Sequence, residues 1–409
     1  MKRVVITGAG AISALGNDWA AVRGFMAAGR SAVVRMSDWE GIKGLNTLLG
    51  APVPPLTLPA HYTRKRTRSM GRVALMSVLA SEAALQDAGL LGDPLLTSGR
   101  VGVAYGSSTG TPEAVADFGR MRSERTTEDI SATTYIRMMP HTTAVNIGVF
   151  FGITGRIVTT SSACTSGSQG IGYAYEAIRS GRQVAMLAGG AEELDATEAA
   201  VFDTLFATST CNDTPQTTPR PFDGGRDGLV LGEGAGTLVL EELEHARARG
   251  ARILAEIVGF GTNSDGAHVT QPKAETMAVA MRLALDDAGL DAARIGYVNA
   301  HGTATDHGDV AESHATHAVF GPTMPVSSLK SYMGHTLGAC GALEAWMTIE
   351  MMRDAWFAPT LNLSSPDPRC APLDYIMQTP RELAVDYVMS NNFAFGGINT
   401  SLVFRRWED

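Results

Sequence analysis

Short apolar stretches that read as strands alternate with helix-forming stretches along the whole chain, and this alternation constrains the fold more than any other feature. The predicted strands of the first half are residues 3–8, 101–106, 156–161 and 184–190. Those of the second half are residues 252–261, 295–302, 324–330, 387–397 and 400–406. The pattern between them predicts helices over 72–88, 167–180, 274–289 and 338–354. Strands that alternate with helices form parallel or mixed sheets covered on both faces, so we expect an α/β fold.

The two halves of the chain resemble each other. Each contains a strand that runs into a turn of small residues and then into a helix, "IVTTSSACTSGSQGIGYAYEAI" at 157–178 and "VSSLKSYMGHTLGACGALEAWMTI" at 326–349. A chain of 409 residues is also too long for one ordinary core. We expect a duplicated fold, with halves 1–250 and 251–409 that share one interface. The longest irregular segment, 208–228, is interpreted as an ordered functional loop.

Charge and cysteine content exclude several classes of protein. The formal net charge of −9 argues against nucleic acid as the main partner. The four cysteines are widely spaced, which is typical neither of a disulfide framework nor of a zinc finger. The first residues enter a strand without a signal-peptide pattern, and no apolar run approaches the roughly 18 residues that a membrane helix needs. We therefore expect a soluble, cytoplasmic protein with no membrane partner.

Cys164 is the candidate nucleophile. It lies between a predicted strand and a predicted helix, where unpaired backbone N–H groups and the positive end of the helix dipole favour a thiolate. The small neighbours Ser162, Ala163, Ser166 and Gly167 permit a tight strand-to-helix turn. The same N–H groups could hold a developing oxyanion. Taken alone, such a cysteine is more often buried and inert.

Two histidines change that interpretation. His301 in "NAHGTATDHGDVAES" and His335 in "SSLKSYMGHTLGACGALEA" each follow a predicted strand and stand beside glycine and threonine in a turn. A catalytic imidazole needs a held tautomer and a clear approach, which such turns can supply. Two imidazoles near a thiol could bind a thioester or enolate oxygen while CO2 is lost. Lys330 and Glu312 would form a charged pair that orients the histidines, although an ordinary ion pair is an equal interpretation.

Five motifs together resemble those of the elongating β-ketoacyl-[acyl-carrier-protein] synthases. In order, they are "SSACTSG", "RPFDGGRDGLVLGEGAG", "NAHGTATDHGD", "KSYMGHTLGACGALEA" and "SNNFAFGGINTSLVF". The resemblance runs from the first residues to the last. It implies the thiolase-like fold, in which a duplicated core forms five αβαβα layers with mixed sheets.

The resemblance also implies residue roles. Cys164 would accept the acyl group, and His301 and His335 would promote decarboxylation of a malonyl unit. Lys330 and Glu312 would support the histidines. The further implied roles are an oxyanion hole from the N–H groups of Cys164 and Phe395, a gate of Phe393 and Phe395, pantetheine contacts from Thr303 and Thr305, and an acyl pocket that includes Thr109 and Phe202.

The implied reaction is a decarboxylative Claisen condensation of malonyl-carrier protein with a Cys164-bound acyl chain, so the enzyme is an acyltransferase. The implied partner is an acyl carrier protein, docked on the basic clusters that contain Arg64, Lys65, Arg68, Arg122 and Arg125. No metal and no cofactor are expected beyond the carrier's phosphopantetheine. The family works as a homodimer, and we expect the same here.

Some residues depart from the family's usual pattern. The chain has "FAFGGIN" where "FGFGGTN" is usual, His307 in "TDHGD", Cys340 where alanine is common, and Thr109 near the implied pocket. These changes leave the catalytic set intact and leave open whether the pathway is fatty-acid elongation or a specialised polyene or polyketide route.

Some features of the sequence are also compatible with other functions. A chain-length-factor-like subunit of a heterodimer would resemble this family but lack the nucleophile. A biosynthetic thiolase would use a second cysteine as its base, and a thiol hydrolase needs fewer groups. His301, His307, His314 and His317 could suggest a metal site, and "LGEGAG" at 231–236 superficially resembles a dinucleotide loop but lacks the full motif.

Overall fold

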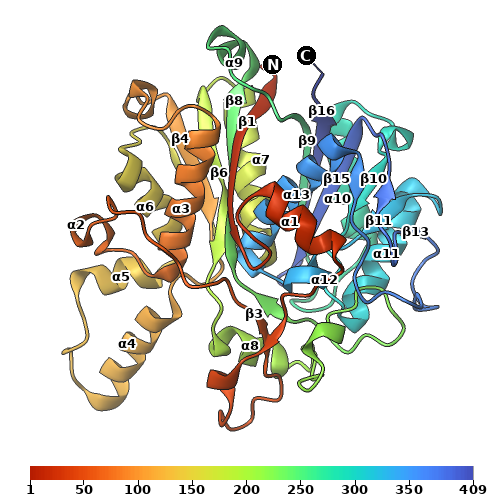
Figure 1. Ribbon diagram of the computed structural model, residues 1–409, viewed down its shortest axis with the longest axis horizontal. Helices are drawn as coiled ribbons and strands as arrows, with labels where there is room; N and C mark the ends of the chain where they lie inside the picture. The colour runs from red at the N-terminus through yellow and green to blue at the C-terminus, as the bar shows by residue number, and fades with distance from the viewer. Residues whose placement is uncertain (409) are drawn as a thin grey trace.

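A computed structural model describes residues 1–408. Its main feature is an 11-stranded mixed sheet that is continuous through both halves of the chain (Figure 1). The strands of the N-terminal half, in spatial order outward from the centre, are β1 (Val4–Ser13), β8 (Gly234–Glu242), β6 (Ala185–Glu192), β4 (Val101–Gly106) and β5 (Ile157–Thr160). Those of the C-terminal half are β9 (Ala255–Ser264), β16 (Ile398–Arg406), β15 (Tyr387–Ala394), β10 (Tyr297–Asn299), β11 (Pro325–Ser327) and β13 (Asp374–Tyr375).

The two halves repeat one topology. From the centre outward, the first three strands of each half pair antiparallel and the next two pairings are parallel. The two halves meet where β1 pairs with β9. The duplication expected from the two similar strand–turn–helix segments is therefore present in the strand order itself. The proposed boundary at residue 250 falls between a short helix, α9 (Leu243–Ala248), and β9.

Helices complete five layers. The central layer is α7 (Ser166–Arg179) and α13 (Cys340–Asp354), which pack against each other and against strands of both halves. One outer layer contains α3 (Arg72–Asp87) and α6 (Thr142–Phe151), and the other contains α10 (Ala274–Ala288) and α11 (Asp306–Phe320). Three buried apolar clusters fill the boundaries between helices and sheet: the largest surrounds the central helices, and one lies under each outer helix layer. The predicted αβαβα arrangement is confirmed.

The remaining elements connect or cover these layers. The other helices are α1 (Trp19–Ala27), α2 (Arg64–Thr67), α4 (Pro112–Glu124), α5 (Ala132–Met138), α8 (Ala196–Asp203) and α12 (Lys330–Met333). The other strands are β2 (Val34–Arg35), β3 (Leu49–Ala51), β7 (Leu231–Gly232), β12 (Trp356–Phe357) and β14 (Arg381–Glu382). Within residues 1–408, no helix combines the length and the apolar character needed to cross a membrane.

Glycines allow the outer helices to approach the sheet closely. A Cβ atom on Gly10 of β1 would lie 2.2 Å from the carbonyl oxygen of Ala80 in α3, and one on Gly261 of β9 would lie 2.1 Å from that of Ala280 in α10. Side chains at these positions would push the helices away from the strands. The same contact at equivalent places is a second sign of the duplication.

One central strand was missed from the sequence. β8 pairs with both β1 and β6, yet its sequence, "GAGTLVLEE", is not among the predicted strands. The glycines Gly234 and Gly236 weaken the strand pattern, because glycine is disfavoured in strands. A Cβ on Gly236 would come within 2.8 Å of the backbone of α13, so packing explains the glycine there. The segment is a strand, which agrees with the incomplete dinucleotide motif.

Candidate active site

Cys164 lies at the junction of β5 and α7, in a 3-10 turn formed by Ala163–Thr165. Ala163 has a φ of +50°, in the left-handed region that residues other than glycine seldom adopt. Hydroxyl groups hold this turn. The Ser166 hydroxyl donates to the carbonyl of Ala163 at 2.7 Å and accepts the N–H of Ser162 at 3.0 Å. The crowded run of small residues therefore builds the sharp strand-to-helix turn that the sequence predicted.

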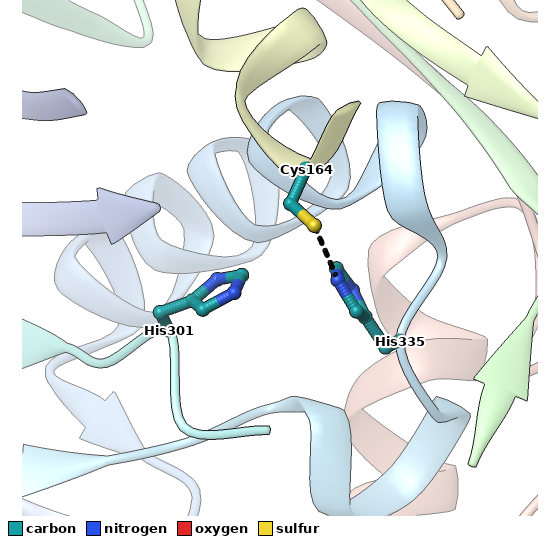
Figure 2. Close-up of side chains that lie close together, drawn as sticks. All are labelled: Cys164, His301 and His335. Carbon is teal, nitrogen blue, oxygen red and sulfur yellow. Dashed lines mark hydrogen bonds between the residues drawn. The ribbon is translucent and has the colours of Figure 1, made fainter. Parts of the chain in front are cut away.

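The Cys164 sulfur faces two imidazoles (Figure 2). Its Sγ atom lies 2.9 Å from Nε2 of His335. The rings of His335 and His301 stand edge to face, with centroids 5.1 Å apart. All three side chains are buried. The strand ends of the two halves, residues 157–160 and 325–327, thus bring the cysteine and His335 together from positions 171 apart in sequence.

Burial keeps this centre uncharged in the free protein. Burial raises the pKa of the Cys164 thiol to about 11, although the Lys330 charge and the backbone N–H groups of Phe395 and Cys164 act in the opposite direction. Burial, followed by the Lys330 charge, holds the pKa of both His301 and His335 well below the ordinary value. The backbone N–H groups favour the thiolate, as expected, but desolvation outweighs them in the free protein. The neutral His335 can accept the thiol proton directly.

Glu312 holds the loop that carries His301. Its two carboxylate oxygens accept the backbone N–H groups of His301 and Gly302, each at 2.7 Å. Burial raises the pKa of Glu312 to about 8, against the effect of these two N–H donors. Glu312 is thus placed to fix the backbone at His301.

Lys330 pairs with a residue that the sequence did not suggest. Its Nζ atom lies 2.5 Å from Oε1 of Glu344 in α13, and the other oxygen of Glu344 accepts the side-chain amide of Asn392 at 2.8 Å. The predicted Lys330–Glu312 pair is therefore wrong. Although burial opposes it, attraction to Glu344 raises the pKa of Lys330, so the lysine stays charged. A lone carboxylate in the otherwise apolar stretch "GACGALEAWMTI" was the available signal for Glu344.

A cavity of about 450 Å³ opens onto the three side chains. Thr303 and Thr305 line it and lie within hydrogen-bond distance of each other at 3.0 Å. The irregular segment 208–228 contributes Arg226, Asp227 and Gly228 to the wall, as expected for a functional loop. The exposed side of the cavity includes His307, whose side chain is 86% exposed.

Of the predicted gate and pocket residues, three line the cavity and one, Thr109, does not. Phe393, Phe395 and Phe202 all line the cavity. The ring of Phe393 faces that of His301 at 6.2 Å between centroids, and the ring of Phe395 packs on that of Phe202 at 5.2 Å. Thr109 is not among the described residues that line the cavity. Its hydroxyl donates instead to the buried Glu198 at 2.7 Å, and Glu192 lies 3.2 Å from the same hydroxyl.

The basic residues predicted to dock a carrier protein are on the surface of the N-terminal half. Arg64 and Lys65 belong to α2 and Arg68 follows it, whereas Arg122 and Arg125 lie at the end of α4. All five are exposed, and within residues 1–408 no acidic side chain pairs with them. α2 and α4 lie on the same side of the molecule in Figure 1.

The histidine-rich segment does not form a metal cluster among the described residues. His314 contacts the backbone carbonyl of Arg369 at 3.0 Å, and His307 is exposed. In residues 1–408 the only group of potential metal ligands is Cys164, His301 and His335, whose ligand atoms lie within 4.8 Å of one another. The direct contact between thiol and imidazole in that group also suits a nucleophile and its proton acceptor.

Cys340 lies behind the nucleophile. Its thiol donates to the backbone carbonyl of Cys164 at 3.2 Å, rather than to the sulfur. Burial holds the pKa of Cys340 well above its ordinary value. Cys340 is thus hydrogen-bonded to the backbone of the nucleophile, whereas the second cysteine of a biosynthetic thiolase would act as a base.

Comparison with known proteins agrees with this geometry. Residues 1–246 match the model of the "Beta-ketoacyl synthase, N-terminal domain", and residues 254–364 match the model of the C-terminal domain. The chain is 38% identical to 3-oxoacyl-[acyl-carrier-protein] synthase 2 of Vibrio cholerae, over 99% of both chains.

Solved structures are similar over the full length. A β-ketoacyl synthase from Burkholderia phymatum is 64% identical, with a TM-score of 0.99 and complete coverage of both chains. A type II polyketide ketosynthase, solved in complex with its acyl-carrier protein, is 29% identical with a TM-score of 0.89 and complete coverage of both. With both family domains matched and the thiol and two imidazoles brought together, the chain belongs to the β-ketoacyl synthase family of condensing acyltransferases, the family that the five motifs indicated.

Proposed function

We propose that this protein elongates an acyl chain carried on Cys164, using a malonyl unit delivered by an acyl carrier protein. The observation that carries the proposal is the 2.9 Å contact between Cys164 Sγ and His335 Nε2, with a second neutral imidazole beside it. The Vibrio cholerae relative is a 3-oxoacyl-[acyl-carrier-protein] synthase, and one structurally similar ketosynthase was solved in complex with its acyl-carrier protein.

The first half-reaction loads the enzyme. His335 accepts the Cys164 proton as the sulfur attacks the thioester of the incoming acyl-carrier protein. The oxyanion that forms is held by the backbone N–H groups of Cys164 and Phe395, which already face the sulfur. The pantetheine thiolate leaves, takes the proton from His335, and departs as a thiol. The products are the Cys164 thioester and the free carrier.

The second half-reaction forms the carbon–carbon bond. The malonyl carboxylate leaves as CO2, and its electron pair forms an enolate whose oxygen accepts N–H groups of His301 and His335. The enolate carbon attacks the Cys164 thioester, the carbon–sulfur bond breaks, and the Cys164 thiolate takes up one proton from solvent. Two neutral imidazoles suit this step, because each can donate one hydrogen bond to the developing negative charge. Burial, and then the charge of Lys330, keep them neutral, and Glu312 fixes the loop of His301.

This reaction requires no metal or cofactor beyond the carrier's phosphopantetheine. Thr303 and Thr305 line the cavity and would contact that arm, and the Phe393–Phe395 segment would gate the acyl pocket. The exposed, unpaired cations Arg64, Lys65 and Arg68, together with Arg122 and Arg125, would dock the acidic carrier protein by charge complementarity.

The proposed assembly is a homodimer. β5 lies at the edge of the large sheet, so one side of its backbone is unpaired within the chain. Its first residue, Ile157, is 42% exposed, and Val149 of the neighbouring α6 is 73% exposed. Apolar residues on an open strand edge favour pairing with another chain. Light scattering of the purified protein tests this, and a monomer at micromolar concentration would contradict it. The cytoplasmic location stays a prediction.

Intact-protein mass spectrometry tests the reaction. Wild type and Cys164→Ala are mixed with acyl-carrier-protein thioesters of several lengths and then with malonyl-carrier protein. The wild type should gain the acyl mass and lose it as a β-ketoacyl-carrier product appears, and Cys164→Ala should show neither change. Cys211→Ser, which alters a half-buried cysteine outside the cavity, should behave as wild type.

The same experiment separates the alternatives. No adduct with any carrier, in a folded protein, would contradict the proposal and favour an accessory subunit of the chain-length-factor type. That accessory role is disfavoured here because Cys164, His301 and His335 are all present and in contact range. The preferred acyl group would distinguish fatty-acid elongation from a specialised polyene or polyketide route.

A further inference from the structure

The peptide group that joins Ala163 to Cys164 carries the N–H group that would hold the oxyanion. The carbonyl oxygen of Ala163 and the N–H of Cys164 belong to this one rigid plane and point in opposite directions. A contact that fixes the carbonyl of Ala163 therefore also fixes the direction of the Cys164 N–H. Ala163 has a φ of +50°, so this orientation is strained for a residue that has a Cβ atom.

One hydroxyl group holds both ends of this strained segment. The Ser166 hydroxyl donates to the carbonyl of Ala163 at 2.7 Å and accepts the N–H of Ser162 at 3.0 Å. Ser166 is fully buried, so solvent does not compete for its hydroxyl. A hydroxyl is suited to this place because it donates one hydrogen bond and accepts another from a single atom. The backbone N–H of Ser166 also donates to the Ala163 carbonyl.

The second half of the chain contains the same turn. Leu337 has a φ of +44° and begins a 3-10 turn that leads into α13, as Ala163 begins the turn that leads into α7. Gly338 therefore occupies the place of Cys164. Its N–H donates to a carboxylate oxygen of Glu192 at 2.9 Å. The turn thus presents its second amide to a carboxylate oxygen, which is what an oxyanion hole requires of the Cys164 N–H.

We propose that Ser166 is a positioning residue that directs the Cys164 N–H at the oxyanion formed when the sulfur attacks a thioester. This inference rests on the proposed function, because the oxyanion forms only in acyl transfer. Without the hydroxyl, Ala163 would relax towards a negative φ, and the peptide plane would rotate together with its N–H. The backbone hydrogen bond from Ser166 would keep the turn formed, so the protein should still fold.

The test compares two reactions of the same sulfur in Ser166→Ala. Acylation by an acyl-carrier-protein thioester passes through an oxyanion, whereas alkylation by iodoacetamide displaces iodide from a saturated carbon and forms none. Removing one oxyanion-hole donor costs about 10²–10³ in rate, so misdirecting one should slow acylation at least about tenfold. Alkylation at the same pH should change by less than about threefold, because burial and the Lys330 charge affect the thiol pKa more than this N–H does. Mass spectrometry of the Cys164 peptide after an acid quench gives both rates.

Two further variants separate positioning from a general loss of structure. Ala163→Gly/Ser166→Ala places glycine where φ is positive, a conformation that glycine adopts without strain, so acylation should partly recover. A merely structural role predicts no recovery, because a second side chain is lost. The matched control is Ser168→Ala in the same helix. Its buried hydroxyl bonds to Thr165 and Thr400 instead, so this variant should keep the wild-type ratio of acylation to alkylation.

Each of three results would overturn the inference. The first is a Ser166→Ala protein with the wild-type ratio of acylation to alkylation. The second is a Ser166→Ala protein that loses both reactions equally or does not fold, as judged by circular dichroism, which would show a structural role. The third is a double variant acylated no faster than Ser166→Ala.

Acylation of the wild type, measured in parallel, separates these results from a failure of the proposed function. If the wild type is acylated and any of the three results is found, only this inference fails. If Cys164 of the wild type accepts no acyl group from any carrier, the proposed function fails and the inference fails with it.

Discussion

Protonation at the catalytic centre is decided by burial rather than by the helix terminus. The Cys164 thiol is in contact with an imidazole of depressed pKa, and its own pKa is raised to about 11. The pair is therefore thiol and neutral imidazole at neutral pH, and the thiolate forms only as substrate is attacked. Such a centre is protected from adventitious oxidation and alkylation, because the thiolate is the reactive form.

Alkylation of Cys164 should follow this raised pKa. With iodoacetamide, the rate at Cys164 should keep rising by about tenfold per pH unit well beyond pH 8.5, because the thiolate fraction increases until pH approaches the thiol pKa. Site-resolved mass spectrometry of the alkylated peptide gives the rate, with a free thiol compound as reference. A plateau below pH 8 would show instead a stable ion pair between Cys164 and a charged imidazole.

The buried pair of Lys330 and Glu344 should be costly to break. Glu344→Leu leaves the Lys330 charge without its partner, and the loss of unfolding free energy should be about 3–5 kcal/mol. The double variant Lys330→Met/Glu344→Leu removes both charges and should recover most of that loss while remaining inactive in condensation. Denaturant unfolding gives both values. A double variant no more stable than Glu344→Leu would show that packing, rather than the unpaired charge, causes the loss.

At the scale of elements, the strand–helix contacts depend on positions that have no side chain. α10 lies on β9 at Gly261, and α3 lies on β1 at Gly10, in the same relation. Glycine at these positions is required by the close approach, because the carbonyl oxygens of the helix occupy the space of a Cβ atom. These contacts fix where the helices sit, and so where the strands that lead to the active-site turns emerge.

Gly261→Ala should therefore destabilise the protein. The new methyl group would lie 2.1 Å from the Ala280 carbonyl oxygen, and relieving such overpacking typically costs about 1–3 kcal/mol. The matched control is Gly24→Ala in α1, where an added Cβ meets no atom within 4 Å. That control should be neutral or stabilising by up to about 1 kcal/mol, because alanine favours a helix over glycine. Equal effects of both substitutions in denaturant unfolding would contradict the packing argument.

At the scale of the whole molecule, the two halves share the central helix layer. α7 from the first half and α13 from the second pack against each other and against strands of both halves, within the largest apolar cluster. The nucleophile comes from one half and both imidazoles from the other. Separating the halves would expose the central helix layer and divide the active site.

The fragments 1–250 and 251–409 should consequently fail to fold alone. Each should show a non-cooperative thermal transition by circular dichroism and bind a hydrophobic dye, because half of the central helix layer is missing. Co-expression of the two fragments should recover acylation of Cys164 if they reassemble. A cooperative transition in either fragment would show that the halves are independent domains.

Local patterns in the sequence were sufficient to predict much of the fold and of the active site. The alternation of strands and helices, the two similar strand–turn–helix segments and the turns around Cys164, His301 and His335 are all short-range features, and each is found where it was predicted. The weaker predictions concerned elements whose local sequence conflicts with their environment. β8 was missed because its glycines, required by the approach of α13, hide a strand pattern.

The sequence by itself determined the family, the duplicated α/β architecture and the identity of the thiol and two imidazoles. Periodicity and motifs depend on residues that are close together in the chain, so they can be recognised without the tertiary structure. Only the tertiary structure decided the partner of Lys330, the protonation state of Cys164 and the environment of Thr109. Glu344 contacts Lys330 across 14 residues, and His335 contacts Cys164 across 171. Glu198 contacts Thr109 across 89. Pairing and burial arise when segments distant in sequence pack together, and desolvation then sets the charge of each group.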